Sequence, residues 1–321
     1  KLNNQAANLD VETSENSIQE SIAQIYIQIL YAAESVKVNE NTLQVSIAQR
    51  DRGQELLNAG SIAKSDLAQL EAQVSTDRYQ LVTAQATLQD YKLQLKQLLE
   101  LDGENEMNVY LPALSDENVL LPLPTKKDVY MSALTLRPEI EASKLSVEAS
   151  ELGIDIAKAG YLPTISLSAG IGTNHTSGSD FTFGEQVKNG WNNSIGVSVS
   201  VPIFNNRQTK SAVQKAKLQR ETSLLSLLDE QKTLYKTIEG LWLDANSAQQ
   251  RYAAANEKLR STQISYDLIS EQFNLGMKNT VELLTEKNNL LQAQQEQLQA
   301  KYMAILNTQL LKFYQGDKLA L

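Results

Sequence analysis

The chain has 321 residues and a mass of 35.6 kDa, and 42% of its residues are hydrophobic against 21% charged, which is the composition of a folded protein. Its net charge of −9 argues against nucleic acid as the main partner, because phosphate backbones attract basic surfaces. The absence of cysteine excludes disulfides, cysteine-based zinc sites and thiol nucleophiles. Glycine and proline are scarce while Gln, Leu, Ala, Lys and Glu dominate, so the composition predicts long helices. No apolar run reaches the roughly 18 to 20 residues of a transmembrane helix.

Residues 14–100 predict two long helices separated by one break. Apolar residues recur at spacings of three, four or seven from Ile18 to Ile47, which is the seam of a coiled coil. Ser14 has the chemistry of an N-cap, so the first helix is expected to begin near it. The break falls at Gly60, because glycine readily takes the left-handed conformation that ends a helix.

The segment that follows these helices differs from them in composition. Residues 102–125 contain three prolines among short apolar runs and are interpreted as a linker or small subdomain. A helix is predicted from about 126 to 159, with Pro138 near a helix start or a kink.

Two segments then alternate in the manner of β-strands. Residues 164–172 and 194–201 place apolar side chains at every second position and Ser, Thr or Gly between them. Tyr161, Trp191 and Phe204 lie near the predicted strand ends. Such strands suit a membrane barrel with an apolar outside, a polar lumen and an aromatic girdle. The alternative is an ordinary solvent-facing hairpin of a soluble domain.

An internal repeat organises the helices. Two further long helices are predicted at 208–275 and 280–314. Sliding the chain by 216 residues lays 55–60 on 271–276, so that the two turn glycines coincide. Each copy is a long helix, a glycine turn and a second long helix, which predicts one helical hairpin used twice. The second copy follows a strand pair and the first does not, so we expect the chain to be a fragment that lacks its N-terminal strands.

No constellation of residues predicts an enzyme. The one histidine, His175, lies in a polar loop between the predicted strands, with no partners for metal binding or catalysis. No glycine-rich turn opens a helix with a Lys-Ser/Thr pair, which excludes a phosphate-binding loop. Carboxylates are scattered over helix faces instead of being paired. We therefore predict no catalytic residue, no metal site and no cofactor.

Several short motifs together resemble the TolC-like outer-membrane efflux proteins, the outer-membrane factors of tripartite efflux and type I secretion systems. The first three are Leu-Arg-Pro-Glu-Ile at 136–140, Tyr-Leu-Pro-Thr-Ile at 161–165 and Val-Pro-Ile-Phe at 201–204. The last two are Phe-Asn-Leu-Gly at 273–276 and Val-Glu-Leu-Leu at 281–284, at the second hairpin turn. The resemblance covers essentially the whole chain.

The resemblance implies a mainly α fold with a small β part. Long coiled-coil hairpins in an internal repeat would form an α-barrel, and the strands would join a trimeric transmembrane β-barrel to which each protomer gives four strands. The expected organisation is a first hairpin at 1–101, an equatorial linker at 102–135, a helix leading to the barrel at 136–160, the strand pair and its extracellular loop at 161–204, a second hairpin at 205–314 and a tail at 315–321.

The function that follows is a passive outer-membrane duct. The expected partners are two further copies of the chain in a homotrimer, a periplasmic adaptor protein, an inner-membrane pump and outer-membrane lipid, and the expected location is the outer membrane of a Gram-negative bacterium with a long periplasmic extension. The alternative function is that of a soluble periplasmic coiled-coil structural or adaptor protein. The sequence does not identify the substrate.

The resemblance also implies a gate at the hairpin tips. Asp66 and Glu282 each lie six residues past a turn glycine, where acids of the family form constrictions and links between helices. It gives Asp66 the partners Phe273 and Lys278, at positions where the family commonly has tyrosine and arginine. Phe273 cannot donate a hydrogen bond and Lys278 lacks the guanidinium fork, so these links are weakened. The family's second acidic position is Thr285 here, which leaves a single ring of carboxylates.

We expect Asp66 and Lys278 to approach each other in the closed state, within or between protomers. The alternative is that Asp66 and Glu282 only stabilise the N-termini of their helices. The turns themselves are expected to be the adaptor-docking surface, because they carry exposed apolar residues at the ends of polar helices. The residues expected there are Gly60, Ser61, Ile62, Gly276 and Met277.

Overall fold

A computed structural model describes residues 1–101, 107–112, 119–178 and 180–319. These residues form long helices and one pair of strands, as predicted. None of the helices in the described ranges is both long enough and apolar enough to cross a membrane. In chain order the elements are α1 Leu2–Asn58, α2 Lys64–Leu98, α3 Lys126–Leu136, α4 Pro138–Ala159, β1 Thr164–Gly172, α5 Phe183–Asn189, β2 Asn192–Ser200, α6 Gln208–Asn274 and α7 Thr280–Gln315.

The chain divides into two compact units. The first comprises Lys1–Ala7 and Ala142–Asp229, and the second comprises Asn8–Glu141 and Glu230–Leu321. The helical hairpins belong to the second unit, and the strands belong to the first.

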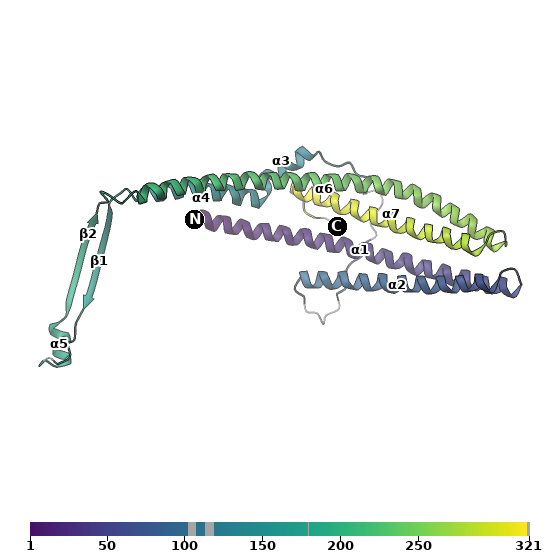
Figure 1. Cartoon of the computed structure of the whole chain (residues 1–321), viewed down its shortest axis with the longest axis horizontal. Helices are drawn as coiled ribbons and strands as arrows, with labels where there is room; N and C mark the ends of the chain where they lie inside the picture. Colours follow the sequence, from purple (N-terminus) through teal and green to yellow (C-terminus); the bar gives the residue numbers. More distant parts are fainter. Residues whose placement is uncertain (102–106, 113–118, 179, 320–321) are drawn as a thin grey trace. The chain divides into compact units, whose positions relative to one another are not determined.

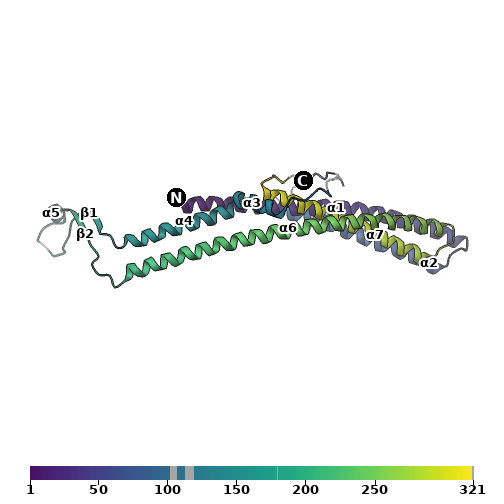
Figure 2. The ribbon, with the colours of Figure 1, turned by 90° about the horizontal axis from the view of Figure 1, so that it is seen from above.

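The second unit is built from two helical hairpins. One consists of α1 and α2, and the other of α7 and the C-terminal part of α6 (Figure 1). The two hairpins lie side by side, with both connecting turns at the same end (Figure 2). Their core includes Ile27 and Leu30 of α1, Tyr252 of α6, and Tyr302 and Leu310 of α7. Burial of this apolar surface is the main force that holds the hairpins together.

Helix α1 begins earlier than predicted. The helix starts at Leu2, and the hydroxyl of Ser14 donates to the carbonyl of Asp10, 2.9 Å away, inside the helix. The N-cap prediction for Ser14 is therefore wrong. No Gly or Pro interrupts the first fifty residues, and a serine hydroxyl is readily satisfied by the carbonyl four residues before it.

A buried arginine joins three elements near the predicted Pro138 kink. Arg137 lies between α3 and α4, and its guanidinium pairs with Glu139 at 2.8 Å and with Glu20 of α1 at 3.2 Å. The ring of Tyr314, in the last turn of α7, stacks 4.3 Å from the guanidinium carbon. Burial raises the pKa of the Tyr314 hydroxyl to about 12. Pro138 opens α4, where its missing N–H leaves no bond unmade.

The first unit carries the strand hairpin. Strands β1 and β2 pair antiparallel, with Ile165 opposite Val199 and Ser166 opposite Ser198. Because side chains alternate between faces, one face is apolar and the other carries Ser, Thr, Asn and Gly. Every residue of both strands is exposed, so neither face is covered within this chain.

A short helix that was not predicted from the sequence lies between the strands. This helix, α5, begins with a capping box, in which Thr182 and Glu185 bond each other's backbone N–H. Its Gln186 accepts from the N–H of Thr176 at 2.8 Å and lies 3.0 Å from Nδ1 of His175. His175 is thus an exposed loop residue, as predicted.

Candidate functional site at the hairpin tips

The two turns have the same backbone geometry. At the first, the N–H of Gly60 donates to Leu57 at 2.9 Å and that of Ser61 donates to Leu56 at 2.8 Å. At the second, Gly276 donates to Phe273 at 2.9 Å and Met277 to Gln272 at 2.8 Å, which are the equivalent residues 216 positions later. These bonds define a Schellman motif, whose C′ residue is left-handed. Both glycines supply that conformation, with φ of 73° and 74°.

The acids of the two repeats occupy the third position of their helices. The carboxylate of Asp66 accepts from the N–H of Ala63 at 3.0 Å, and that of Glu282 accepts from the N–H of Asn279 at 3.3 Å. The side-chain oxygen of Asn279 in turn accepts from the N–H of Glu282 at 2.9 Å, which completes a capping box. Ala63 has no side-chain oxygen, so the first repeat keeps half of this arrangement.

Lys278 pairs with an acid of its own repeat. Its ammonium group lies 2.6 Å from the carboxylate of Glu282, four residues on. This hydrogen bond, together with the bond from Asn279, lowers the pKa of Glu282. Within one chain, therefore, Lys278 contacts Glu282 and Asp66 contacts Ala63. A contact between Asp66 and Lys278 stays a prediction for neighbouring protomers.

Phe273 is the centre of a small apolar core at the tip. Its side chain is 3% exposed and packs with Leu70 of α2 and Leu283 of α7. The partly buried residues around this core are Leu56, Tyr266, Ile269 and Leu284. Three helices thus meet on one ring, so Phe273 holds the two hairpins together at their turns.

A second link between the hairpins was not predicted from the sequence. Arg52 of α1 pairs with Glu55 at 2.8 Å and donates to the carbonyl of Asn274 at 3.3 Å, the last residue of α6. An arginine at this position satisfies a free carbonyl and complements the negative end of the helix dipole. The next residue of α1, Gly53, faces Leu70 so closely that any larger side chain would collide with it.

The turns expose apolar side chains. Leu275 and Met277 are 69% and 71% exposed at the second turn, whereas Ile62 at the first turn is half-buried. Large apolar residues that are this accessible on neighbouring positions are typical of a contact surface. Ser61 is exposed beside Gly60.

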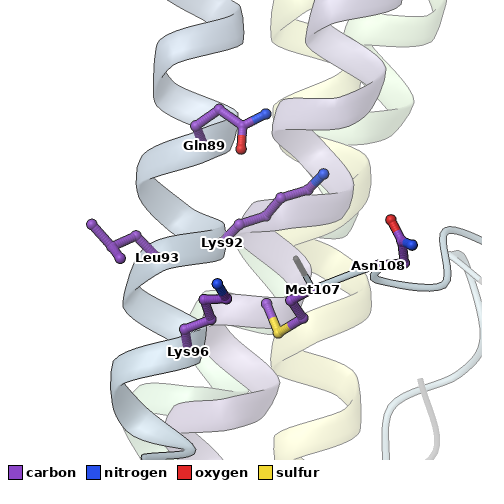
Figure 3. Close-up of a pocket in the computed structure, with 6 residues that line it drawn as sticks. All are labelled: Gln89, Lys92, Leu93, Lys96, Met107 and Asn108. Carbon is purple, nitrogen blue, oxygen red and sulfur yellow. The ribbon is translucent and has the colours of Figure 1, made fainter. Parts of the chain in front are cut away.

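A cavity lies at the opposite end of α2. Its volume is about 460 Å³, and Gln89, Lys92, Leu93 and Lys96 of α2 line it together with Met107 and Asn108 (Figure 3). The cavity is some thirty residues along α2 from Gly60 and is separate from the tip. The described residues contain no cluster of His, Asp or Glu side chains that could hold a metal ion.

Comparisons with known proteins agree on one family. The family model for "Outer membrane efflux protein" matches residues 129–316, more than half of the chain. The outer membrane efflux protein BepC of Brucella suis is 25% identical over 294 residues, covering 91% of this chain and 61% of BepC. The outer membrane protein TolC of Escherichia coli is 25% identical over 311 residues, covering 92% of this chain and 60% of TolC. The chain therefore spans about 60% of the length of these curated relatives.

A solved structure of CusC shares the fold. It superposes with a TM-score of 0.83 at 19% identity, over 99% of this chain and 72% of CusC. CusC itself undergoes conformational changes that accompany its folding and the formation of a transmembrane channel. At this identity the likeness concerns the fold.

Proposed function

Because this chain belongs to the outer membrane efflux protein family, we propose that it is part of an outer-membrane duct that passively conducts substrates out of the periplasm. Family membership, the mainly α fold and the outer-membrane location were all predicted from the sequence and are confirmed. The duct would serve a tripartite efflux or type I secretion system.

The strand hairpin carries the proposal. Both of its faces are exposed in the single chain, one apolar and the other lined by small polar residues. An apolar face opposite a polar face is the arrangement that separates lipid from a water-filled lumen. We propose that Ile165, Leu167, Val197 and Val199 face lipid and that Ser166 and Ser198 face the lumen.

The assembly is proposed to be a homotrimer. A sheet of two strands has two unpaired edges, and such edges are costly in lipid unless other strands pair with them. The exposed turns, with Leu275 and Met277, are proposed to dock a periplasmic adaptor. An inner-membrane pump would supply the energy, because a duct of this kind only conducts.

The tip is proposed to be the gate. Opening would separate the hairpins at Gly60 and Gly276, where each hairpin reverses direction. Phe273 would be the main closing contact, with Asp66, Glu282 and Lys278 adding only weak electrostatic attraction, because water screens exposed ion pairs.

Planar-bilayer recording tests this function. The full-length protein, meaning the complete product of the gene that encodes this chain, should give discrete single-channel currents after reconstitution. The alternative, a soluble periplasmic coiled-coil or adaptor protein, would leave the bilayer conductance at the level of a detergent blank. Family membership already favours the duct over this alternative.

A further inference from the structure

Three helices of the second unit share a buried charged cluster. Lys287 of α7 donates to Asp77 of α2 and to the hydroxyl of Ser46 of α1, and this hydroxyl in turn donates to Asp77. The side chains of Lys287 and Asp77 are 3% and 1% exposed. The other carboxylate oxygen of Asp77 accepts from Gln73 at 2.9 Å. We call these three residues, Ser46, Asp77 and Lys287, the buried triad.

The buried triad differs from the contacts at the tip. The Lys278–Glu282 pair is 33% and 41% exposed, so water screens it and little free energy is lost when it breaks. Breaking the buried triad would leave an ammonium group and a carboxylate unpaired among buried residues, which is strongly unfavourable. Burial lowers the pKa of Lys287, because the charged ammonium group has lost its contact with water, and the hydrogen bond that Lys287 donates to Asp77 opposes this shift.

The geometry of the triad permits one register only. Moving α7 along α2 by one helical turn, roughly 5 Å, would carry Lys287 out of reach of both acceptors. An apolar contact tolerates such a shift better, because hydrophobic burial has no direction. A buried ion pair therefore adds little net stability but can fix how helices align.

The position of the triad divides the hairpins into two parts. Lys287 lies seven residues into α7 and Asp77 thirteen residues into α2, so the triad is roughly 10 to 20 Å behind the turns. The Phe273 core and the exposed Lys278–Glu282 pair lie on the turn side of it. A cavity of about 520 Å³ lined by α1, α2 and α7 begins beside the triad at Gln73 and extends away from the turns to Ala84 and Gln295.

We propose that the buried triad is a fixed pivot, which keeps α1, α2 and α7 aligned while the segments between it and the turns move apart. Ser46, Asp77 and Lys287 are thus positioning residues for the gate and have no direct role in conduction. The inference rests on the proposed function only in requiring that the tip moves.

Spin-label distances in the full-length protein test the pivot. This chain has no cysteine, so one pair of cysteines at a time can be introduced into it, at Ser65 and Val281 on the turn side or at Thr87 and Gln299 on the far side, all of them exposed. Any cysteine of the full-length protein outside this chain is replaced by serine. Labelled protein is diluted with unlabelled protein before assembly, so that measured distances lie within one protomer. Phe273→Ala serves to loosen the tip.

With the triad intact, Phe273→Ala should widen the Ser65–Val281 distance distribution and leave the Thr87–Gln299 distribution unchanged. Adding Lys287→Met should widen the Thr87–Gln299 distribution as well, by about one helical turn, roughly 5 Å. The paired change Asp77→Leu with Lys287→Met is the matched control, because it leaves no buried charge and is expected to fold. It should also widen the far-side distribution while the melting temperature stays near that of the wild type.

Two results would overturn the pivot. One is a Thr87–Gln299 distance that moves together with the tip while the triad is intact. The other is a paired apolar variant whose far-side distances stay as narrow as in the wild type, which would make the triad a merely structural contact. Neither result bears on whether the protein conducts, so a failure of the pivot and a failure of the proposed duct are distinguishable.

Discussion

Individual side chains at the tip differ widely in how strongly they can hold the proposed gate closed. Phe273 is almost fully buried among three helices, and removing such a ring typically costs about 3 to 5 kcal/mol. A contact of Asp66 with Lys278 across protomers would be partly exposed and contribute about 0 to 1 kcal/mol. Phe273→Ala should therefore raise the single-channel conductance of the full-length protein more than Asp66→Ala does, and Asp66→Ala should raise it modestly.

Bilayer recordings of both variants beside the wild type provide the check. Glu71→Ala is a suitable control, since Glu71 is an exposed acid that lies on α2, five residues after Asp66. Wild-type conductance in both the Phe273 and the Asp66 variant would remove the gate hypothesis. Asp66 would then be only the acid that accepts from Ala63 at the start of α2.

Glu282 gives the tip a pH dependence with a definite sign. The hydrogen bond from Lys278 and the bond from Asn279 lower its pKa below the ordinary 4.5. A carboxyl of this kind stabilises the fold above pH 4.5, and the stabilisation is lost as the pH falls through the lowered pKa. Glu282→Gln keeps the capping geometry but removes the charge. Its melting temperature should lie below that of the wild type at neutral pH, and the two should converge below pH 4.5. A pH-independent difference would contradict this assignment.

The residues that sequence reasoning missed share one physical cause. Asp66 and Glu282 could be paired through the repeat, because their relation is a fixed offset along the chain. Asp77 and Lys287 meet only after two hairpins pack, and their separation of 210 residues leaves no local pattern. One signal was available: Lys287 follows the buried Leu283 by four residues, so a charge falls on the apolar face of α7.

The two faces of the strand hairpin should respond differently to a charged side chain. Val199 lies opposite Ile165 on the apolar face, and Ser198 lies opposite Ser166 on the polar face. If the apolar face contacts lipid, Val199→Arg should cost about 2 to 4 kcal/mol near the bilayer midplane. Ser198→Arg, one residue away, should be tolerated in a water-filled lumen. The measurement is the folded fraction of the full-length protein in lipid vesicles. Equal behaviour of the two variants would refute the assigned faces.

The exposed turns should contact a periplasmic adaptor. A photo-crosslinking residue at Met277 should capture the hairpin of a periplasmic adaptor, because Met277 and Leu275 present apolar surface at the tip. Tyr110 is the control position, since it is also highly exposed but lies in the linker. Mass spectrometry of the crosslinked peptides identifies the contact. Preferential capture at Tyr110 would move the docking surface to the linker.

Periodicity predicted the elements better than it predicted their ends. The long helices and both strands lie where the spacing of apolar residues places them, because each pattern reports which face is buried or exposed. The start of α1 was wrong because Ser14 satisfies its hydroxyl inside the helix. Helix α5 was missed because it is only seven residues long, too short to show a period. Parts of the predicted linker, 102–106 and 113–118, lie outside the described residues.

A single chain leaves apolar side chains and strand edges that other molecules must cover. Two hairpins and two strands leave exposed apolar residues on α4 and α6, such as Ile156 and Leu225, and two strand edges without a partner among the described residues. Sequence patterns identify such surfaces but not their occupants, because burial within one chain and burial between chains leave the same periodicity. Family resemblance supplied the number of protomers in the sequence analysis.

The full-length protein is therefore expected to assemble as a trimer. Unpaired backbone groups cost several kcal/mol each in hydrocarbon, so an open two-stranded hairpin is not stable there by itself. Identical subunits that carry open edges pair them by closing a ring, which gives cyclic symmetry and a barrel without edges. The full-length protein solubilised in detergent should accordingly have three times the mass of one protomer in light scattering or native mass spectrometry. Ser168→Pro, in the middle of β1, is expected to reduce the trimer fraction, because proline removes a donor from the strand ladder. A stable wild-type monomer in detergent that still conducts would contradict the trimer, since two hairpins cannot enclose a lumen alone.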